Sequence, residues 1–288
     1  IIHITNPEVG YFAKVLKKAG AKAKVVVTIH DFVRVVSHYN GGGGGLQTLY
    51  DYIVTRNMGD SIRYADFIIF TSSHELGYAK AHYRLHRHSL IFIGAKDSFL
   101  SKPLPRRSDR SGKPFTIGYI GGLIKSRNIM FILKTAELLD ATYRFEIYGT
   151  GAALQEMLEY KERKNLRNVE FLGFASESSI QRIYDSFDVF MSCSYVDVAS
   201  LPIEDALARG LPVVAAKRNI YDDELRKRIY EADTPRHAAQ LIRKLRKSGY
   251  PKSRQSAIIK YAKTVSWQEV AKKTETVYYE LVRDKSGM

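Results

Sequence analysis

Apolar and polar positions alternate in blocks along residues 188–216, where the pattern is clearest. The apolar run at 189–191 is too short for a helix and is bounded by small polar residues, which predicts a buried strand. Ser200 can cap a following helix that has Pro202 in its first turn and Gly210 just after its end. A second apolar run, 211–216, completes a βαβ unit with parallel strands. In such sheets, ligands bind where a loop leaves the carboxyl end of a strand.

Similar blocks fill the rest of the chain. Strands are predicted at 1–4, 24–29, 66–71 and 90–93, and the segments 115–123, 145–151 and 169–174 each contain a strand that runs into a turn. Helices are predicted at 11–19, 46–63, 129–139 and 180–187. Basic helices follow Ala216. This alternation predicts an α/β protein with doubly wound parallel sheets.

Several local features refine this picture. In the helix at 11–19, one face carries Tyr11, Phe12, Val15, Leu16 and Ala19, and the other carries Lys14, Lys17 and Lys18. Ser73 is the expected N-cap of the helix after strand 66–71. Residues 101–114 are rich in proline and basic residues, which predicts a domain boundary. The five consecutive glycines at 41–45 predict a flexible loop without a binding role.

Composition limits the classes of function. The net charge of +15 favours contact with nucleic acid, anionic lipid or sugar-nucleotide phosphates, or is only a solvated surface. Cys193 is the single cysteine, so a disulfide within the chain is excluded and a cytoplasmic setting fits. No apolar run approaches the ~20 residues of a transmembrane helix, and no signal peptide is visible.

The stretch at 188–216 resembles the donor-site signature of GT-B glycosyltransferases, in particular the retaining group called family 4. Asp197 and Asp205 fall on the family's two acidic positions, and Leu201 starts its Leu-Pro pair. The family has Glu at both acidic positions and Gly where Ser200 stands, and Glu204 lies one residue out of register. The alternative interpretation is that Glu204 and Asp205 are surface carboxylates that compensate the helix dipole.

Further motifs follow in the family's order. Gly121 and Gly122 precede Leu123 where the family has Gly-Arg-Leu, so Gly122 departs from the pattern. Arg127 falls on the family's Lys, with Lys125 close by, and the resemblance implies that these cations hold the donor diphosphate. Turns at Gly149, Gly151 and Phe174, the strand-end His30 and the Ser266-Trp267 helix start also match.

The resemblance implies two Rossmann-like domains, 1–105 on the acceptor side and 114–262 on the donor side, with a last helix at 263–288 that crosses back. The first domain resembles an incomplete form that lacks the family's first strands and glycine-rich turn. The implied reaction moves a sugar from a nucleotide-diphosphate sugar to an acceptor with retention of configuration, without an essential metal or other cofactor.

The resemblance also assigns roles to residues. His30, Arg127 and Asp197 are the implied catalytic residues; Asp197 contacts the sugar hydroxyls and Asp205 the ribose. The implied donor contacts are Gly121, Gly122, Lys125, Gly149, Gly151, Phe174, Ser200, Leu201, Glu204 and Asp205.

Three alternatives stay open: a sugar-nucleotide-binding remnant without turnover, a basic nucleic-acid-binding protein, and another GT-B enzyme such as an epimerase or phosphorylase. The basic helical segment at 11–24 adds the hypothesis of peripheral contact with an anionic membrane that carries a lipid acceptor.

Overall fold

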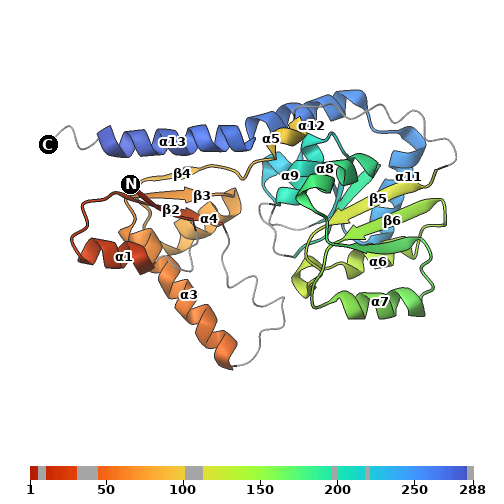
Figure 1. Cartoon of the computed structure of the whole chain (residues 1–288), viewed down its shortest axis with the longest axis horizontal. Helices are drawn as coiled ribbons and strands as arrows, with labels where there is room; N and C mark the ends of the chain where they lie inside the picture. The colour runs from red at the N-terminus through yellow and green to blue at the C-terminus, as the bar shows by residue number, and fades with distance from the viewer. Residues whose placement is uncertain (6–10, 31–44, 101–112, 196–199, 218–220, 284–288) are drawn as a thin grey trace. The chain divides into compact units, whose positions relative to one another are not determined.

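The computed structural model describes residues 1–5, 11–30, 45–100, 113–195, 200–217 and 221–283. The chain divides into two compact units (Figure 1). The first contains residues 1–94, 220–222 and 267–288, and the second contains 95–219 and 223–266. Each is built on a parallel sheet, so the predicted α/β class is confirmed.

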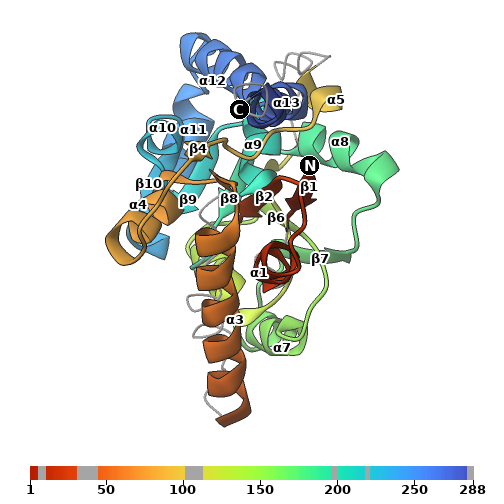
Figure 2. The ribbon, with the colours of Figure 1, turned by 90° about the vertical axis from the view of Figure 1, so that its left-hand side faces the viewer.

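The first unit contains a four-stranded sheet in the order β1-β2-β3-β4. Its elements are β1 (Ile2–Ile4), α1 (Tyr11–Lys18), β2 (Val25–Ile29), α3 (Gly45–Tyr64), β3 (Phe67–Phe70), α4 (Ser73–His82), β4 (His88–Leu90) and α13 (Trp267–Arg283). Every residue of β2 is buried, because helices cover both faces of the sheet. Helices α1, α3 and α4 contribute to the core on one face, and α1 lies beside α3 (Figures 1 and 2).

The opposite face of this sheet packs against α13. Val26, Phe67 and Ile69 of the sheet meet Val277 and Leu281 of the helix. The last helix of the chain therefore completes the core of its first unit.

The second unit contains a six-stranded parallel sheet in the order β10-β9-β8-β5-β6-β7. Its strands are β5 (Phe115–Ile120), β6 (Tyr143–Tyr148), β7 (Val169–Gly173), β8 (Val189–Ser192), β9 (Val213–Ala216) and β10 (Tyr230–Ala232). Its helices are α5 (Asp97–Leu100), the 3₁₀ turn η2 (Lys125–Arg127), α6 (Met130–Ala136), α7 (Leu154–Arg163), α8 (Glu177–Ser186), α9 (Leu201–Ala208), α10 (Asp223–Arg226), α11 (Pro235–Ser248) and α12 (Lys252–Thr264).

This sheet is also covered on both faces. Helices α6, α7 and α11 build one core with alternate strand residues such as Ile117 and Ile147. On the other face, the rings of Phe99, Tyr184 and Phe190 pack together, with neighbouring ring centroids 5.5–5.6 Å apart. Among the described residues, no helix combines the length and apolar character that a membrane crossing requires.

The apolar side chains expected on one face of α1 are only partly packed. Ala13 is buried, whereas Tyr11, Phe12 and Val15 are 40–50% exposed. The small Ala13 side chain allows α1 to approach its neighbours closely. The lysines are also engaged: Lys14 pairs with Asp60 at 2.8 Å and Lys17 with Asp66 at 2.6 Å.

Two local predictions also need correction. The N-cap of α4 is Ser72, whose hydroxyl accepts a hydrogen bond from the Glu75 amide at 3.1 Å, and Ser73 is the first helical residue. The strand predicted at 90–93 lies two residues earlier, as β4. Both shifts are of the size by which a local pattern misplaces the ends of elements.

Candidate functional site

The order of the six-stranded sheet creates a switch point between β5 and β8. From β5 the chain winds outward through β6 and β7, then returns to β8 on the other side of β5 and continues to β9 and β10. The chain therefore leaves β5 and β8 toward opposite sides of the sheet order. Open α/β sheets bind ligands outside the carboxyl ends of the strands at such a switch point.

Backbone hydrogen bonds join the loop after β5 to the loop after β6. The Gly121 amide donates to the Tyr148 carbonyl at 3.0 Å, and the Leu123 amide to the Thr150 carbonyl at 2.9 Å. A Cβ at Gly149 would lie 1.9 Å from the Gly121 carbonyl oxygen, and one at Gly151 would lie 2.4 Å from that of Leu123. Glycine is thus required at both positions, because another residue would separate the two loops.

A second set of bonds joins η2 to the loop after β8. The Tyr195 amide donates to the Ser126 carbonyl at 2.8 Å, and the Cys193 thiol to the Arg127 carbonyl at 3.1 Å. The Arg127 guanidinium lies 3.5 Å from the Ser194 hydroxyl oxygen. The loop after β8 therefore holds the Arg127 backbone. The Arg127 side chain is half-buried, and Lys125, two residues earlier, is exposed.

Glu204 and Asp205 are buried, so the interpretation as surface carboxylates is wrong. They are 6% and 5% exposed because α9 packs against α5 and α12. The Glu204 carboxylate accepts a hydrogen bond from the Tyr261 hydroxyl at 3.3 Å, and that of Asp205 accepts one from the Lys96 amide at 3.2 Å. Burial raises the pKa of Asp205 to about 6.

The remaining predicted donor residues lie at the same edge of the second unit. Ser200 is the buried N-cap of α9, and Leu201 at its first turn is 42% exposed. Phe174 follows β7 and is 81% exposed. The cap position predicted for Ser200 is confirmed, although its side chain makes no cap hydrogen bond. Asp197 lies outside the described residues.

His30 lies in the first unit, at the carboxyl end of β2, where it lines a cavity of about 750 Å³. Burial lowers the pKa of His30. His3, to which sequence reasoning gave no role, lines the same cavity and is bonded to Tyr278. The sequence could not indicate this contact, because Tyr278 lies 275 residues away from His3.

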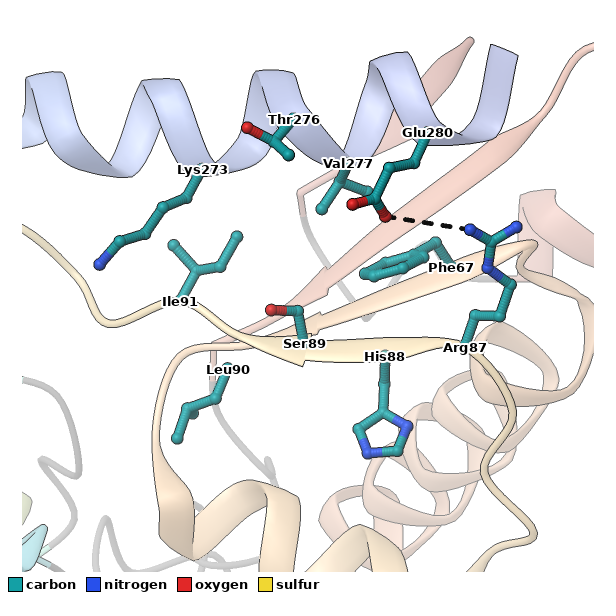
Figure 3. Close-up of a pocket in the computed structure, with 10 residues that line it drawn as sticks. All are labelled: Phe67, Arg87, His88, Ser89, Leu90, Ile91, Lys273, Thr276, Val277 and Glu280. Atoms are coloured by element: carbon teal, nitrogen blue, oxygen red, sulfur yellow. Dashed lines mark ion pairs between the residues drawn. The ribbon is translucent and has the colours of Figure 1, made fainter. Parts of the chain in front are cut away.

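A separate groove of about 510 Å³ lies between β4 and the second half of α13 in the first unit (Figure 3). Arg87 and Glu280 face each other across one end at 4.0 Å, and Lys273 reaches toward the strand at the other. Phe67 and Ile91 form part of the floor. Both charges of the ion pair are exposed, so this pair contributes little to stability.

Side chains of His, Cys, Asp and Glu in the described part of the chain do not gather in threes as a metal site requires. The cations at the switch point are instead the groups suited to hold an anion there.

Residues 114–248 match the family described as glycosyl transferases group 1. A curated relative is the UDP-N-acetylglucosamine–peptide N-acetylglucosaminyltransferase GtfA subunit of Streptococcus pneumoniae serotype 4. It is 24% identical over 225 residues, which are 73% of this chain and 41% of that protein.

Solved structures of glycosyltransferases share the fold. Sucrose-phosphate synthase from Thermosynechococcus elongatus has a TM-score of 0.80 and 17% identity, covering 98% of this chain and 74% of that chain. The pneumococcal O-GlcNAc transferase GtfA with UDP and GlcNAc has a TM-score of 0.69 and 18% identity, covering 97% and 57%. Anabaena HepE with UDP-glucose has a TM-score of 0.71 and 16% identity, covering 98% and 78%.

These likenesses establish the fold as that of GT-B glycosyltransferases. This chain spans less than two thirds of the length of GtfA, both as the curated protein and as the solved chain.

Proposed function

Because residues 114–248 form a group 1 glycosyltransferase domain, we propose that this protein transfers a glycosyl unit from a nucleotide-diphosphate sugar to an acceptor. The observation that carries this proposal is the anchored pair of cations at the switch point. Bonds from the β8 loop fix the backbone of Arg127, and Lys125 lies two residues before it. A preorganised positive charge is what a departing diphosphate requires.

The nucleotide we propose is UDP. The solved structures of GtfA with UDP and GlcNAc and of HepE with UDP-glucose share the fold of this chain. The resemblance of residues 188–216 to the retaining family 4 supports transfer with retention. The anomeric configuration of the product, read by proton NMR, tests that part.

We propose no essential metal, because Arg127 and Lys125 supply positive charge to the leaving group. Unchanged turnover in the presence of EDTA is the expected result. A loss of turnover that Mg²⁺ or Mn²⁺ restores would contradict this part of the proposal.

Asp205 remains the proposed partner of the ribose hydroxyls, with Glu204 beside it on the first turns of α9. For Asp205 this role requires the nucleoside to approach a carboxylate already bonded to the Lys96 amide. A carboxylate oxygen can accept more than one hydrogen bond, so the Lys96 contact is compatible with it.

The main alternative is a donor-binding remnant without turnover. Gly122 favours it, because the family's arginine is missing there. Release of UDP from UDP-glucose separates the two functions. A remnant would melt at a higher temperature in the presence of UDP-glucose but would release no UDP from it.

The primary experiment measures the affinity for UDP, GDP and ADP by thermal shift and calorimetry, in the wild type and in Arg127→Ala. Loss of a charge-assisted hydrogen bond costs about 1.5–3 kcal/mol, so UDP should bind about 10- to 150-fold more weakly to the variant. Arg167→Ala is the matched control, because Arg167 is an exposed arginine at the opposite, amino end of β7. Equal affinities of the two variants, or no binding of any nucleotide, would overturn the assignment.

A second proposal concerns the partner surface. Helix α1 exposes the stacked rings of Tyr11 and Phe12 beside Val15, and Lys18 follows at its end. Apolar side chains next to cations suit an anionic membrane interface, such as the cytoplasmic leaflet.

We expect Phe12→Ser to reduce sedimentation with phosphatidylglycerol vesicles several-fold, because an exposed aromatic ring that inserts into lipid is lost. Tyr279→Ser removes a ring of similar exposure on α13 and serves as the control. Equal binding of the wild type to phosphatidylcholine and phosphatidylglycerol vesicles would contradict the proposal.

A further inference from the structure

The cavity of about 750 Å³ in the first unit lies between the carboxyl half of its sheet and the first half of α13. Strand residues at alternate positions, such as Thr28 with His30 and Ile69 with Thr71, line it from below. Trp267, Val270, Thr274 and Tyr278 line it from the helix. Farther along the same sheet face, Val26 and Phe67 pack against Val277 and Leu281, and the separate groove of Figure 3 opens beside β4. The cavity discussed here lies at the carboxyl ends of the strands, where open α/β sheets bind ligands.

Polar groups converge on one part of the cavity wall. His3 Nδ1 lies 2.5 Å from the Tyr278 hydroxyl oxygen, and its Nε2 lies 2.7 Å from the Thr28 hydroxyl oxygen. The His3 and Tyr278 rings meet edge to face with centroids 5.7 Å apart. This network holds a hydroxyl and an imidazole at fixed positions on the wall, with His30 nearby. A sheet face covered only for packing would carry apolar side chains at these positions instead.

The converging groups are uncharged at neutral pH. Burial lowers the pKa of His3, and the neighbouring His30 lowers it further; burial also lowers the pKa of His30. Lys272 also lines the cavity, but its amine pairs with Glu269 at 2.6 Å. Glu275 on the same helix carries the opposite charge. The cavity wall therefore favours a neutral ligand over an anion.

Most of the remaining wall is apolar, although Thr5, Thr71 and Thr274 also line it. Ile69, Ile91, Phe92 and Ile93 line it from the sheet side, and Val270 and Ala271 from the helix. Trp267 is 40% exposed and presents an aromatic ring. A pocket with a few placed polar groups in an apolar wall binds a ligand that has one polar end and one apolar end.

We propose that this cavity binds the acceptor, and that the acceptor is an uncharged glycoside with an apolar aglycone. The sugar hydroxyls of the glycoside form hydrogen bonds with the part of the wall that contains His3, Thr28 and His30. The aglycone packs against the isoleucines and Trp267. The acceptor role rests on the proposed glycosyl transfer, whereas the binding itself does not.

Trp267 is the single tryptophan of the chain, so its fluorescence reports on this cavity without a label. The probes are octyl glucoside below its micelle concentration, octyl sulfate with the same alkyl chain, and free glucose. We expect a saturable blue shift with octyl glucoside and much weaker responses to the other two.

Variants test the polar wall. Tyr278→Phe removes one hydroxyl and should weaken octyl glucoside binding about fivefold, the effect of one hydrogen bond. His3→Ala should weaken it more, and Tyr278→Phe carries the test if His3→Ala fails to fold. Lys273→Ala, in the separate groove of Figure 3, is the control and should bind like the wild type.

The proposal is overturned if octyl sulfate matches octyl glucoside, if no saturable change occurs, or if folded Tyr278→Phe and His3→Ala bind like the wild type. Binding of UDP, measured on the same sample, separates this inference from the proposed function. UDP binding without glycoside binding overturns this inference alone. If the glycoside binds but UDP does not, the cavity is still a glycoside-binding site, but its role as the acceptor site of a glycosyl transfer is overturned.

Discussion

Asp205 is a single residue whose burial has a measurable cost. An acid whose pKa is raised in the folded state binds its proton more tightly there, so stability is greatest below the unfolded pKa and falls as the pH rises through the folded value. For Asp205 that window runs from 3.8 to about 6. At neutral pH the ionised group therefore costs up to about 3 kcal/mol.

We predict that Asp205→Asn melts at a higher temperature than the wild type near neutral pH, and that the difference disappears below about pH 4. Asp66→Asn is the control of opposite sign. Burial alone raises the pKa of Asp66, but hydrogen bonds from Lys17 and the Val25 amide outweigh it and lower the pKa. A lower melting temperature for Asp205→Asn at neutral pH would show that the ionised carboxylate stabilises the fold.

Gly122 is a position where this chain departs from the family pattern that it resembles and where the structure offers room. A Cβ there would have no heavy atom within 4 Å. We predict that Gly122→Arg binds UDP about tenfold more tightly at low salt, because a second guanidinium joins the phosphate site. Calorimetry checks the affinity, and weaker or unchanged binding by a stable variant would contradict the prediction.

Alanine substitutions supply the controls for this glycine. Gly122→Ala should fold and bind like the wild type. Gly149→Ala should lose about 1–3 kcal/mol of stability or more, because its Cβ would meet the Gly121 carbonyl oxygen at 1.9 Å. The two substitutions are chemically identical, so the difference between them measures the contact between the loops.

Among the elements, α9 depends on an ion pair that is largely buried. The Arg209 guanidinium is 1% exposed, pairs with Asp185 of α8 at 2.7 Å and donates to the Phe99 carbonyl at 2.8 Å. Asp185→Ala removes a carboxylate partner from that buried charge and should lower the free energy of unfolding by about 3–5 kcal/mol. Denaturant melts check this, with Glu280→Ala as the control because its pair with Arg87 is exposed. Equal effects of the two substitutions would contradict the prediction.

Buried strands were the elements most readily predicted. The run at 66–71 contains β3, and the run at 189–191 lies within β8. Such runs are recognisable because strands that are covered on both faces consist almost entirely of apolar residues. The contacts of α1 could not be predicted in this way, because Lys14 and Lys17 pair with Asp60 and Asp66, which are 46 and 49 residues away.

The candidate site likewise combines features that are local in the sequence with contacts between distant residues. The turn expected at Gly149 and Gly151 is local in the sequence, and in the structure these glycines allow the backbone to approach Gly121 and Leu123 closely. The burial of Glu204 and Asp205 depends on Tyr261 and Lys96, which are 57 and 109 residues away. The contact between His3 and Tyr278 spans 275 residues. Contacts at these separations leave no periodicity in the sequence.

For the whole molecule, the net charge of +15 predicts weak binding to any polyanion. We expect duplex DNA to bind at low salt and to be released between about 50 and about 200 mM salt, because such binding depends on counterion release. The shift in melting temperature with UDP should persist through that range, since the proposed donor site also includes uncharged residues such as Ser200 and Leu201. Fluorescence anisotropy with labelled DNA checks the first expectation, and a DNA complex that resists salt would favour the nucleic-acid alternative.

The place of α13 in the first unit has a consequence for biosynthesis. A ribosome delivers residues 1–94 first and residues 267–288 only after nearly all of the second unit. Until then, Val26, Phe67, Ile69 and Ile91 have no helix to cover them, for on the order of ten seconds or more at ordinary elongation rates. The second unit can mature meanwhile, because its own core needs nothing from α13. The half of the chain made first is thus the half completed last, and its exposed sheet face is a natural target for chaperones during translation.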